Sequence, residues 1–453
     1  MSDPRLLSRR EFVKTAGSAA AAASFLSVKP QPARAEAGRR RYAIVGTGDR
    51  ACGMWGRALV ERYADVLEFV GLCDINSRRA EVAKNIIGVA CPTFTSFDEM
   101  CDKSKPDLLM VTTVDAFHSQ YIVAALDRGI DVMTEKPMVI DEKQCKAVLD
   151  AEARNKRKIV VTFNYRYAPK HQKIKEILMS GQIGRIISVD FSWYLDVIHG
   201  ADYFRRWHRL KSKGGSLWVH KATHHFDLVN WWLDADPVEV SASASLNVYG
   251  KNGPFRFTHC RPCPHKSKCQ FYYDITKSER RMKIYVGPEQ VDGYHRDGCV
   301  FREDIDIYDS MSALVKYSNG AAMTYSLNAF MPFEGYRLAF NGEKGRLEVR
   351  DYERQPWNVS EETEIHLTKN FGEREQVALP KVEGGHGGGD DRLRDLIFRK
   401  ADAPEYMRLP DSRAGAMSCL TGIAARTSVE QKRPVKIAEL IRLAPEKGRA
   451  QSG

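Results

Sequence analysis

The chain has 453 residues, 43% of them hydrophobic, and carries a formal net charge of +11. This length is enough for two domains with a full hydrophobic core, and the composition is that of an ordinary globular protein. Ten cysteines are too few for a disulfide scaffold of this size, and no dense basic cluster with interleaved aromatic residues supports nucleic-acid binding.

The first 35 residues have the pattern of an export signal. A twin-arginine sequence at 8–14, an Ala-rich apolar stretch at 16–28 and a small-x-small cleavage site at 33–35 follow one another. The apolar stretch is shorter than the ~20 residues of a membrane-spanning helix, so no stable membrane anchor is expected. A disordered basic N-terminus is the alternative. We expect 1–35 to be a signal peptide recognised by the twin-arginine export machinery, which makes the mature protein periplasmic.

The stretch 41–74 has the order strand, glycine turn, helix and strand. An apolar run at 42–45 leads into the turn GTGDRA at 46–51, apolar residues then recur at helical spacing, and the run 69–73 ends in an acid. This order, with an acid at the end of the second strand, favours a dinucleotide-binding unit over a structural glycine turn.

The residues of this turn have separate physical roles. Gly46 permits the tight turn, Gly48 lets the backbone approach a pyrophosphate, and Ala51 keeps the helix close to the strand, with Arg50 in the same turn. The start of the helix offers free N–H groups to the phosphates. Asp74 is placed to bind the ribose, which favours NAD because a carboxylate repels a 2′-phosphate. Two arginines shortly after it, Arg78 and Arg79, leave NADP as an alternative cofactor.

Helices and strands alternate as far as Asn164. Five strands with helices between them predict an α/β fold in which a doubly wound parallel sheet forms a Rossmann domain over 41–164. The expected strands are 42–45, 69–73, 108–112, 131–134 and 159–163, and the expected helices after the acid are 78–85, 97–101, 118–128 and 141–155.

The character of the sequence changes after a helix at 169–180. Longer, partly alternating strand-like runs without long helices between them predict an α+β domain over 165–440 with a large, mainly antiparallel open sheet. An Asn-Gly turn at 318–320 predicts a hairpin. An open sheet invites face-to-face pairing, so we expect a homo-oligomer. The expected strands are 186–193, 238–248, 312–317, 321–329, 336–340 and 346–350, and the expected late helices are 391–400 and 413–431.

The motif Glu135-Lys136-Pro137 directly follows the strand 131–134, at the edge where a doubly wound sheet binds ligands. With the glycine turn and the antiparallel second half, the chain resembles the Gfo/Idh/MocA oxidoreductases over about 41–437. The resemblance implies an NAD(P)-dependent dehydrogenase that acts on a carbohydrate, a sugar or a cyclitol.

The resemblance also implies roles for single residues. Lys136 matches the lysine that lies between nicotinamide and substrate and orients the reacting hydroxyl, and Glu135 adjoins the cofactor. His118 matches a residue near the nicotinamide, with a histidine that merely begins a helix as the alternative. Asn164 and Arg166 match the crossover where cofactor and substrate meet. A structural ion pair is an equal interpretation of Arg166.

A second matching stretch is GGSLWVHKATHHFD at 214–227. His224 falls on the family's catalytic histidine and Asp227 on a later aspartate, but His220 stands where the family has an aspartate. His220 and His224 share one helix face, and no carboxylate completes a zinc motif, so we expect both to face the substrate. We expect His224 to be the general base, with Lys136 steadying the charge on the oxygen.

Four cysteines fall in a polar insertion at 249–301. Cys260, Cys263 and Cys269 form C-x2-C-x5-C, and Cys299 follows. Four thiolates suit a structural zinc ion or an iron–sulfur cluster, whereas disulfides or free thiols are the alternatives in an oxidising compartment. The insertion is expected to pin a long loop over the substrate face.

Three functions remain open at this stage. The first is hydride transfer between a sugar or polyol and NAD, with Tyr194 or Trp193 stacking on the sugar and His386 reaching the site from a glycine loop that could also be a plain linker. The second is a redox-neutral NAD-dependent glycosidase, which suits an exported protein that must keep its cofactor tightly bound. The third is a non-catalytic NAD or sugar binder, since His220 replaces the expected aspartate.

Overall fold

The computed structural model describes residues 38–357, 363–379 and 387–444. The export pattern at 1–35 and His386 lie outside these described residues. From Arg40 onward the chain forms one unit built on two sheets. Among the described residues, no helix is both long and apolar enough to cross a membrane.

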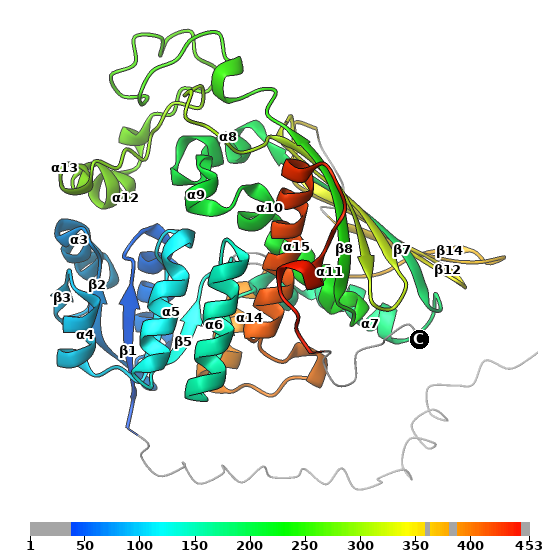
Figure 1. Cartoon of the computed structure of the whole chain (residues 1–453), viewed down its shortest axis with the longest axis horizontal. Helices are drawn as coiled ribbons and strands as arrows, with labels where there is room; N and C mark the ends of the chain where they lie inside the picture. The colour runs from blue at the N-terminus through cyan, green and yellow to red at the C-terminus, as the bar shows by residue number, and fades with distance from the viewer. Residues whose placement is uncertain (1–37, 358–362, 380–386, 445–453) are drawn as a thin grey trace, which may run out of the picture. The chain divides into compact units, whose positions relative to one another are not determined.

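The first sheet has six parallel strands in the order β3-β2-β1-β4-β5-β6 (Figure 1). This confirms the predicted doubly wound parallel sheet; the two-residue β3 was missed because it is too short to show a period. The strands are β1 (Arg40–Val45), β2 (Leu67–Cys73), β3 (Thr93–Phe94), β4 (Leu108–Val111), β5 (Asp131–Thr134) and β6 (Ile159–Val161).

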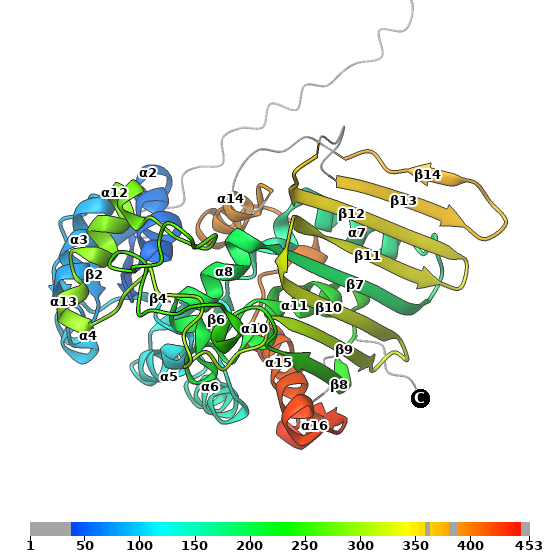
Figure 2. The same cartoon turned by 90° about the horizontal axis from the view of Figure 1, so that it is seen from above.

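Helices cover both faces of this sheet, with α2 on one side and α5 and α6 on the other (Figure 2). All four residues of β4 are therefore buried, as expected for a central parallel strand. The helical segments are η1 (Ala51–Arg57), α2 (Ala58–Tyr63), α3 (Ser77–Ile87), α4 (Phe97–Ser104), η2 (Asp115–Phe117), α5 (His118–Asp127), α6 (Glu142–Asn155), η3 (Asn164–Tyr167) and α7 (Pro169–Met179).

The second sheet has nine strands in the order β14-β13-β12-β11-β7-β10-β9-β8-β15 (Figure 2). Only β7 and β10 pair in parallel, so the prediction of a mainly antiparallel sheet is confirmed. The strands are β7 (Ile186–Asp196), β8 (Pro237–Ser245), β9 (Ser310–Tyr317), β10 (Ala322–Met331), β11 (Glu334–Gly342), β12 (Gly345–Arg354), β13 (Thr363–Lys369), β14 (Arg374–Gln376) and β15 (Val435–Lys436).

Several helices lie between β7 and β8, where the sequence predicted strands without long helices between them and placed only His220 and His224 on a helix face. The longest of these helices is buried along its whole length, so it lacks the polar face on which a periodic pattern depends. These segments are α8 (Val197–Arg205), η4 (Trp207–Arg209), α9 (Lys211–Gly214), α10 (Leu217–His220) and α11 (Ala222–Leu233).

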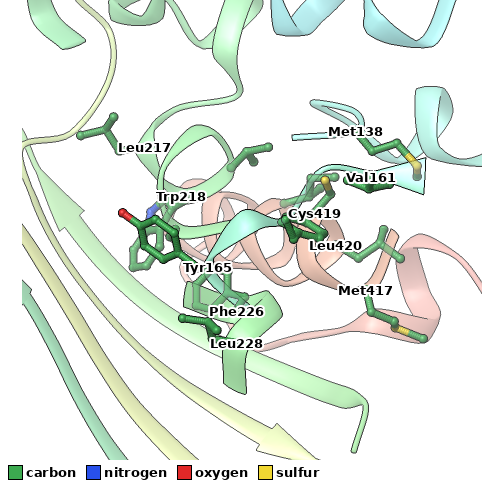
Figure 3. Packing of buried hydrophobic residues seen from close by; sticks show 14 of the residues in the cluster. Met138, Val161, Tyr165, Leu217, Trp218, Phe226, Leu228, Met417, Cys419 and Leu420 are labelled. Atoms are coloured by element: carbon green, nitrogen blue, oxygen red, sulfur yellow. The ribbon is translucent and has the colours of Figure 1, made fainter. Parts of the chain in front are cut away.

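The C-terminal helix α15 (Ser412–Gln431) joins the two halves of the core. It packs against α11 and β8. Figure 3 shows Cys419 and Leu420 of this helix near Met138 and Val161 of the first half, with Phe226 of the second half close by. Smaller late segments are α14 (Gly389–Arg394), η8 (Asp395–Arg399), η9 (Glu405–Met407) and α16 (Ile437–Leu440).

The segment 249–301, which the sequence predicts to be an insertion and for which we keep that name, contains short helical segments and extended loops. Its helices α12 and α13 lie over α3 of the first half (Figure 1). The segments are η5 (Gly250–Asn252), η6 (Ile275–Lys277), α12 (Glu279–Arg281), η7 (Met282–Val286) and α13 (Glu289–Asp292).

Candidate active site

A cavity of about 1180 Å3 runs from the carboxyl ends of the parallel strands to the second sheet. At one end it is lined by the glycine turn and Asp74, and at the other by Trp193 and Tyr336. The expected catalytic residues Lys136, His220 and His224 line it as well. A single cavity therefore has room for a dinucleotide and for a second ligand.

The glycine turn has the shape that a dinucleotide requires. Gly46 has φ of +85°, and a Cβ there would lie 2.6 Å from the backbone nitrogen of Thr113, so only glycine fits. A Cβ on Gly48 would meet the hydroxyl of Tyr285 at 3.4 Å and little else, which leaves the backbone open to a ligand. Ala51 is buried outside the cavity lining and packs the helix onto the sheet.

The environment of Asp74, at the end of β2, suits NAD. Oδ2 of Asp74 accepts hydrogen bonds from the backbone nitrogen of Thr47 at 2.8 Å and from its hydroxyl at 3.0 Å. Arg79, which could have bound a 2′-phosphate, lies 3.5 Å from Asp74 and 2.7 Å from Asp292. Because its charge is shared between two carboxylates, a 2′-phosphate would meet net negative charge here.

Residues 279–294 of the insertion, which we call the strap, cover the end of the cavity that is lined by the glycine turn and Asp74. Asp49 of the glycine turn donates its backbone N–H to the Tyr285 hydroxyl at 3.0 Å and pairs with Arg280 at 2.7 Å. The Asn76 side chain donates to the carbonyl of Pro288 at 2.9 Å. The expectation that the insertion covers the substrate face is thus corrected, because these contacts hold it on the dinucleotide side.

Glu135 and His118 are fixed beside the glycine turn. Oε1 of Glu135 accepts from Arg50 at 2.6 Å and from the Trp55 indole at 2.7 Å. Burial acts to raise the pKa of Glu135, but Arg50 and Trp55 together hold it below its usual value. Nδ1 of His118 lies 2.7 Å from the carbonyl of Pro137, and burial lowers its pKa. Glu135, Arg50 and His118 all line the cavity.

Lys136 follows β5 and reaches across the cavity to α10. Its Nζ donates to the carbonyl of His220 at 3.1 Å. Burial lowers the pKa of Lys136 to about 8, against the opposing effect of Asp115 and Glu135. The side chain is therefore a cation that can lose its proton close to neutral pH.

His220 has an acidic partner that the sequence analysis did not identify. Its Nδ1 lies 2.5 Å from Oδ2 of Asp115, which follows β4 in η2. Burial holds the pKa of His220 below its usual range, with Lys136 as a further cause, and burial raises the pKa of Asp115 while Lys136 and Arg206 lower it. The position of Asp115 just beyond a parallel strand was the available signal.

His224 lines the same cavity but is held differently. Its ring stacks on that of Tyr165 at a centroid distance of 4.3 Å. His225 instead bonds Tyr325 through Nδ1 at 2.7 Å and lies outside the cavity lining. His224 and His225 thus differ in their surroundings, and of the two only His224 lines the cavity.

Two expected substrate residues bind each other instead. Arg166 donates to Asp227 through Nε at 2.7 Å and through a second nitrogen at 2.5 Å, and both side chains are buried outside the cavity lining. The prediction that Arg166 and Asp227 contact the substrate is therefore corrected. The charge of each side chain is already satisfied by the other.

Replacing Asp227 with asparagine is expected to destabilise the protein without a specific effect on substrate binding. The change leaves Arg166 charged and unpaired in the interior, which costs about 3–5 kcal/mol. Thermal unfolding measures this as a lower melting temperature. An unchanged melting temperature with a raised KM would instead restore the substrate role.

Asn164 and Tyr194 also differ from their expected roles. The Asn164 amide donates to Asp390 at 2.6 Å and does not line the cavity. Tyr194 packs on Phe333 and points to the face of β7 opposite Trp193, because side chains alternate along a strand. Of the two aromatic candidates, only Trp193 lines the cavity.

The four cysteines of the insertion meet around a separate small cavity of about 10 Å3. All ten cysteines carry free thiols. The guanidinium of Arg205 donates to the sulfur of Cys260 at 3.3 Å. Among the described side chains, however, no group of three or more His, Cys, Asp or Glu is arranged to hold a metal ion. The members of this cluster are Cys260, Cys263, Cys269 and Cys299.

Comparison with known proteins agrees with this geometry. A sequence model described as "Oxidoreductase family, NAD-binding Rossmann fold" matches residues 40–163, and one described as "Oxidoreductase family, C-terminal alpha/beta domain" matches residues 175–437. YteT of Bacillus subtilis (strain 168), which its name describes as an oxidoreductase without stating a substrate, is 41% identical over 427 residues, 89% of this chain and 99% of that protein.

More distant relatives have named substrates. Inositol 2-dehydrogenase/D-chiro-inositol 3-dehydrogenase of Lactiplantibacillus plantarum is 28% identical over 253 residues, 53% of this chain and 69% of that protein. Among solved structures, the WlbA dehydrogenase of Bordetella pertussis in complex with NADH and UDP-GlcNAcA has a TM-score of 0.60 at 18% identity, covering 88% of this chain and 99% of that chain. At that identity the likeness concerns the fold alone.

Proposed function

The chain belongs to the Gfo/Idh/MocA oxidoreductase family, whose N-terminal domain is an NAD-binding Rossmann fold, and we propose that it transfers a hydride between a sugar or polyol carbinol and NAD. The convergence of Lys136, His220 and His224 on a cavity that also contains the glycine turn and Asp74 carries this proposal. NAD would supply the hydride acceptor when bound, and Asp74 would hold its ribose while the glycine turn would hold its phosphates.

In this mechanism His220 removes the proton of the substrate hydroxyl. When its Nδ1–H donates to Asp115, Nε2 is the free acceptor, and the Asp115 carboxylate stabilises the imidazolium that forms. The Lys136 ammonium donates to the same substrate oxygen and steadies its developing charge. We expected His224 to be the base, but the carboxylate partner favours His220 and leaves His224 to position the substrate.

The strap supports a further proposal, that NAD stays bound from one turnover to the next. For the dinucleotide to leave, the contacts of Asp49 with Tyr285 and Arg280 must open. A retained cofactor must be returned to its starting redox state within each cycle. This favours the redox-neutral glycosidase as the second candidate function, in which the substrate takes the hydride back.

The double variant Arg280→Ala, Tyr285→Ala is expected to lose NAD about 10-fold faster, because it removes two hydrogen bonds and one ion pair to Asp49 and the cover over Gly48. The measurement is the nicotinamide content of the protein after gel filtration for increasing times. Arg256→Ala is the matched control, since Arg256 lies in the same insertion and pairs with Glu303 outside the cavity. Equal retention in the double variant would contradict the role of the strap.

One experiment separates the candidate functions. Purified protein is denatured to identify any released nicotinamide, and native protein is incubated with sugars, polyols and glycosides. Reduced nicotinamide formed from a sugar or polyol supports the oxidoreductase. Aglycone released without net reduction supports the glycosidase, and neither product from the whole panel supports a non-catalytic binder.

We also propose that residues 1–35 direct export through the twin-arginine machinery, so that the mature protein works in the periplasm as a homo-oligomer. The order of the signal regions supports export, and the open sheet supports pairing of subunits. Fractionation of cells that produce the wild type or the double variant Arg9→Lys, Arg10→Lys tests export to the periplasm. Light scattering of the mature protein tests its oligomeric state.

We propose that the four cysteines bind a structural zinc ion or an iron–sulfur cluster. Their meeting around one small cavity supports this, and the metal would tie together an insertion that lacks long elements. Burial raises the pKa of Cys260 and of Cys269, so binding must displace protons and weakens as the pH falls.

Elemental analysis of the mature protein is expected to find zinc or iron, and Cys263→Ser is expected to lose it along with thermal stability. Cys91→Ser is the control, because Cys91 is buried in the other half of the chain. Oxidised cysteine pairs in the mass spectrum of the unreduced protein, with no metal, would support the disulfide alternative.

A further inference from the structure

Lys221 is a buried cation of the cavity for which the mechanism above has no use. It lies between His220 and His224, is only 4% exposed and lines the cavity. Its ammonium makes no hydrogen bond or ion pair with any residue in the described part of the chain. A buried ammonium of this kind needs a partner, since burial removes the water that would otherwise solvate its charge.

The aromatic neighbours of Lys221 hold its side chain without satisfying it. Nζ lies 4.8 Å from the centroid of the Trp193 ring and 5.8 Å from that of Tyr165. Ring faces attract a cation, but they offer no acceptors of ordinary strength to its three N–H groups. The rings therefore fix the direction of the ammonium and leave its hydrogen bonds for a ligand.

The carboxylates near Lys221 are engaged elsewhere or lie at the mouth of the cavity. Glu334 accepts from His199 at 2.7 Å and lies 3.6 Å from Arg354, and Glu353 is exposed. Burial lowers the pKa of Lys221, and these two carboxylates act to raise it. These carboxylates lower the free-energy cost of burying the charge of Lys221, but neither forms an ion pair with it.

Several other cations of the cavity, unlike Lys221, pair with a carboxylate. Lys170 pairs with Asp351, Arg206 with Asp202 at 3.2 Å and Arg50 with Glu135 at 2.6 Å. Lys136 also has no ion pair among the described residues, but it donates to the His220 carbonyl and has a role in the proposed mechanism. Lys221 is therefore the buried ammonium that remains for another group of the ligand.

We propose that Lys221 binds a carboxylate of the substrate, which makes the substrate an acidic sugar such as a hexuronic or aldonic acid. This rests on the proposed function in placing the substrate in this cavity. A carboxylate matches a single ammonium, whereas a phosphate is typically met by an arginine fork or several backbone N–H groups. The guanidinium of Arg206, which also lines the cavity, pairs with Asp202 through one of its nitrogens.

The test compares acids with their neutral counterparts on NAD-loaded wild-type protein, Lys221→Met and Lys221→Arg. The compounds are glucuronate and galacturonate beside glucose, galactose and the two methyl uronates, with glucose 6-phosphate as the phosphate arm. Two readouts are taken, the thermal melting temperature with each compound and kcat/KM. Melting reports binding whether or not hydride transfer occurs, so the binding site and the proposed function can fail separately.

Wild-type protein is expected to be stabilised by at least one uronate more than by its hexose or methyl ester. Lys221→Met is expected to lose about 30-fold in affinity for that acid, and Lys221→Arg to keep part of it. Acid binding without turnover supports the site and overturns the oxidoreductase proposal. Equal binding of acids and neutral sugars, equal binding by wild type and Lys221→Met, no binding from the whole set, or a preference for the phosphate would each overturn the carboxylate site.

Discussion

Replacing Lys136 with methionine is expected to lower kcat by about 100- to 10,000-fold while the protein still folds and retains nicotinamide. Methionine keeps the length of the side chain but removes the ammonium that would stabilise charge on the substrate oxygen. The Nζ of Lys136 is held by the His220 carbonyl at 3.1 Å, so its position in the wild type is defined. Single-turnover hydride transfer with bound cofactor measures the chemical step directly.

The pH profile provides a second readout of the same residue. Burial lowers the pKa of Lys136 to about 8, so wild-type kcat/KM should fall as the pH rises above that value and the ammonium loses its proton. Lys136→Arg keeps a charge throughout, and any activity it retains should lack this alkaline decline. Lys146→Met is the control, because Lys146 is exposed on α6 and pairs with Asp150. Turnover by Lys136→Met within threefold of wild type would exclude the proposed role.

Asp115→Asn is expected to reduce kcat by about 100-fold or more while leaving the fold and NAD content intact. An amide at this position can donate to Nδ1 of His220, which then carries its proton on Nε2 and can no longer accept one from the substrate. The short 2.5 Å contact between Asp115 and His220 makes this tautomer sensitive to the change. Steady-state kinetics with a fixed substrate measure the loss.

Parallel variants decide which histidine is the base. If His220 is the base, His220→Asn should lose as much kcat as Asp115→Asn, and the double variant little more, because the two residues act as one unit. His224→Asn should mainly raise KM. Asp150→Asn, on the exposed face of α6, controls for the loss of a carboxylate. A larger loss of kcat in His224→Asn would return the role of base to His224.

Much of the fold was predictable because it depends on short-range pattern. The buried run 42–45, the glycine turn and the acid at position 74 lie within a single stretch of chain, and the strand–helix alternation leads to one topology. The long strands of the second sheet alternate between polar and apolar residues, and this alternation identified them as strands. Helix α11 escaped the pattern because it is buried all round, and β3 because it has two residues.

The candidate site was predictable only in its motif residues. Lys136, His220 and His224 were identified from local sequence and do line one cavity. Arg166 and Asp227 were also in matching positions, but they satisfy each other in the interior. Sequence position cannot distinguish a charge that faces a ligand from one that faces another charge, because both are placed by the same backbone.

The sequence alone thus determined the family and the dinucleotide-binding turn and predicted Lys136 as a residue of the site, since each depends on neighbouring residues. Only the tertiary structure paired Asp115 with His220, brought Tyr285 to Asp49 and left Lys221 without an ion-pair partner among the described residues. These relations join residues as much as 236 positions apart. They depend on which side chains packing brings within hydrogen-bond distance, and no local periodicity or propensity contains that information.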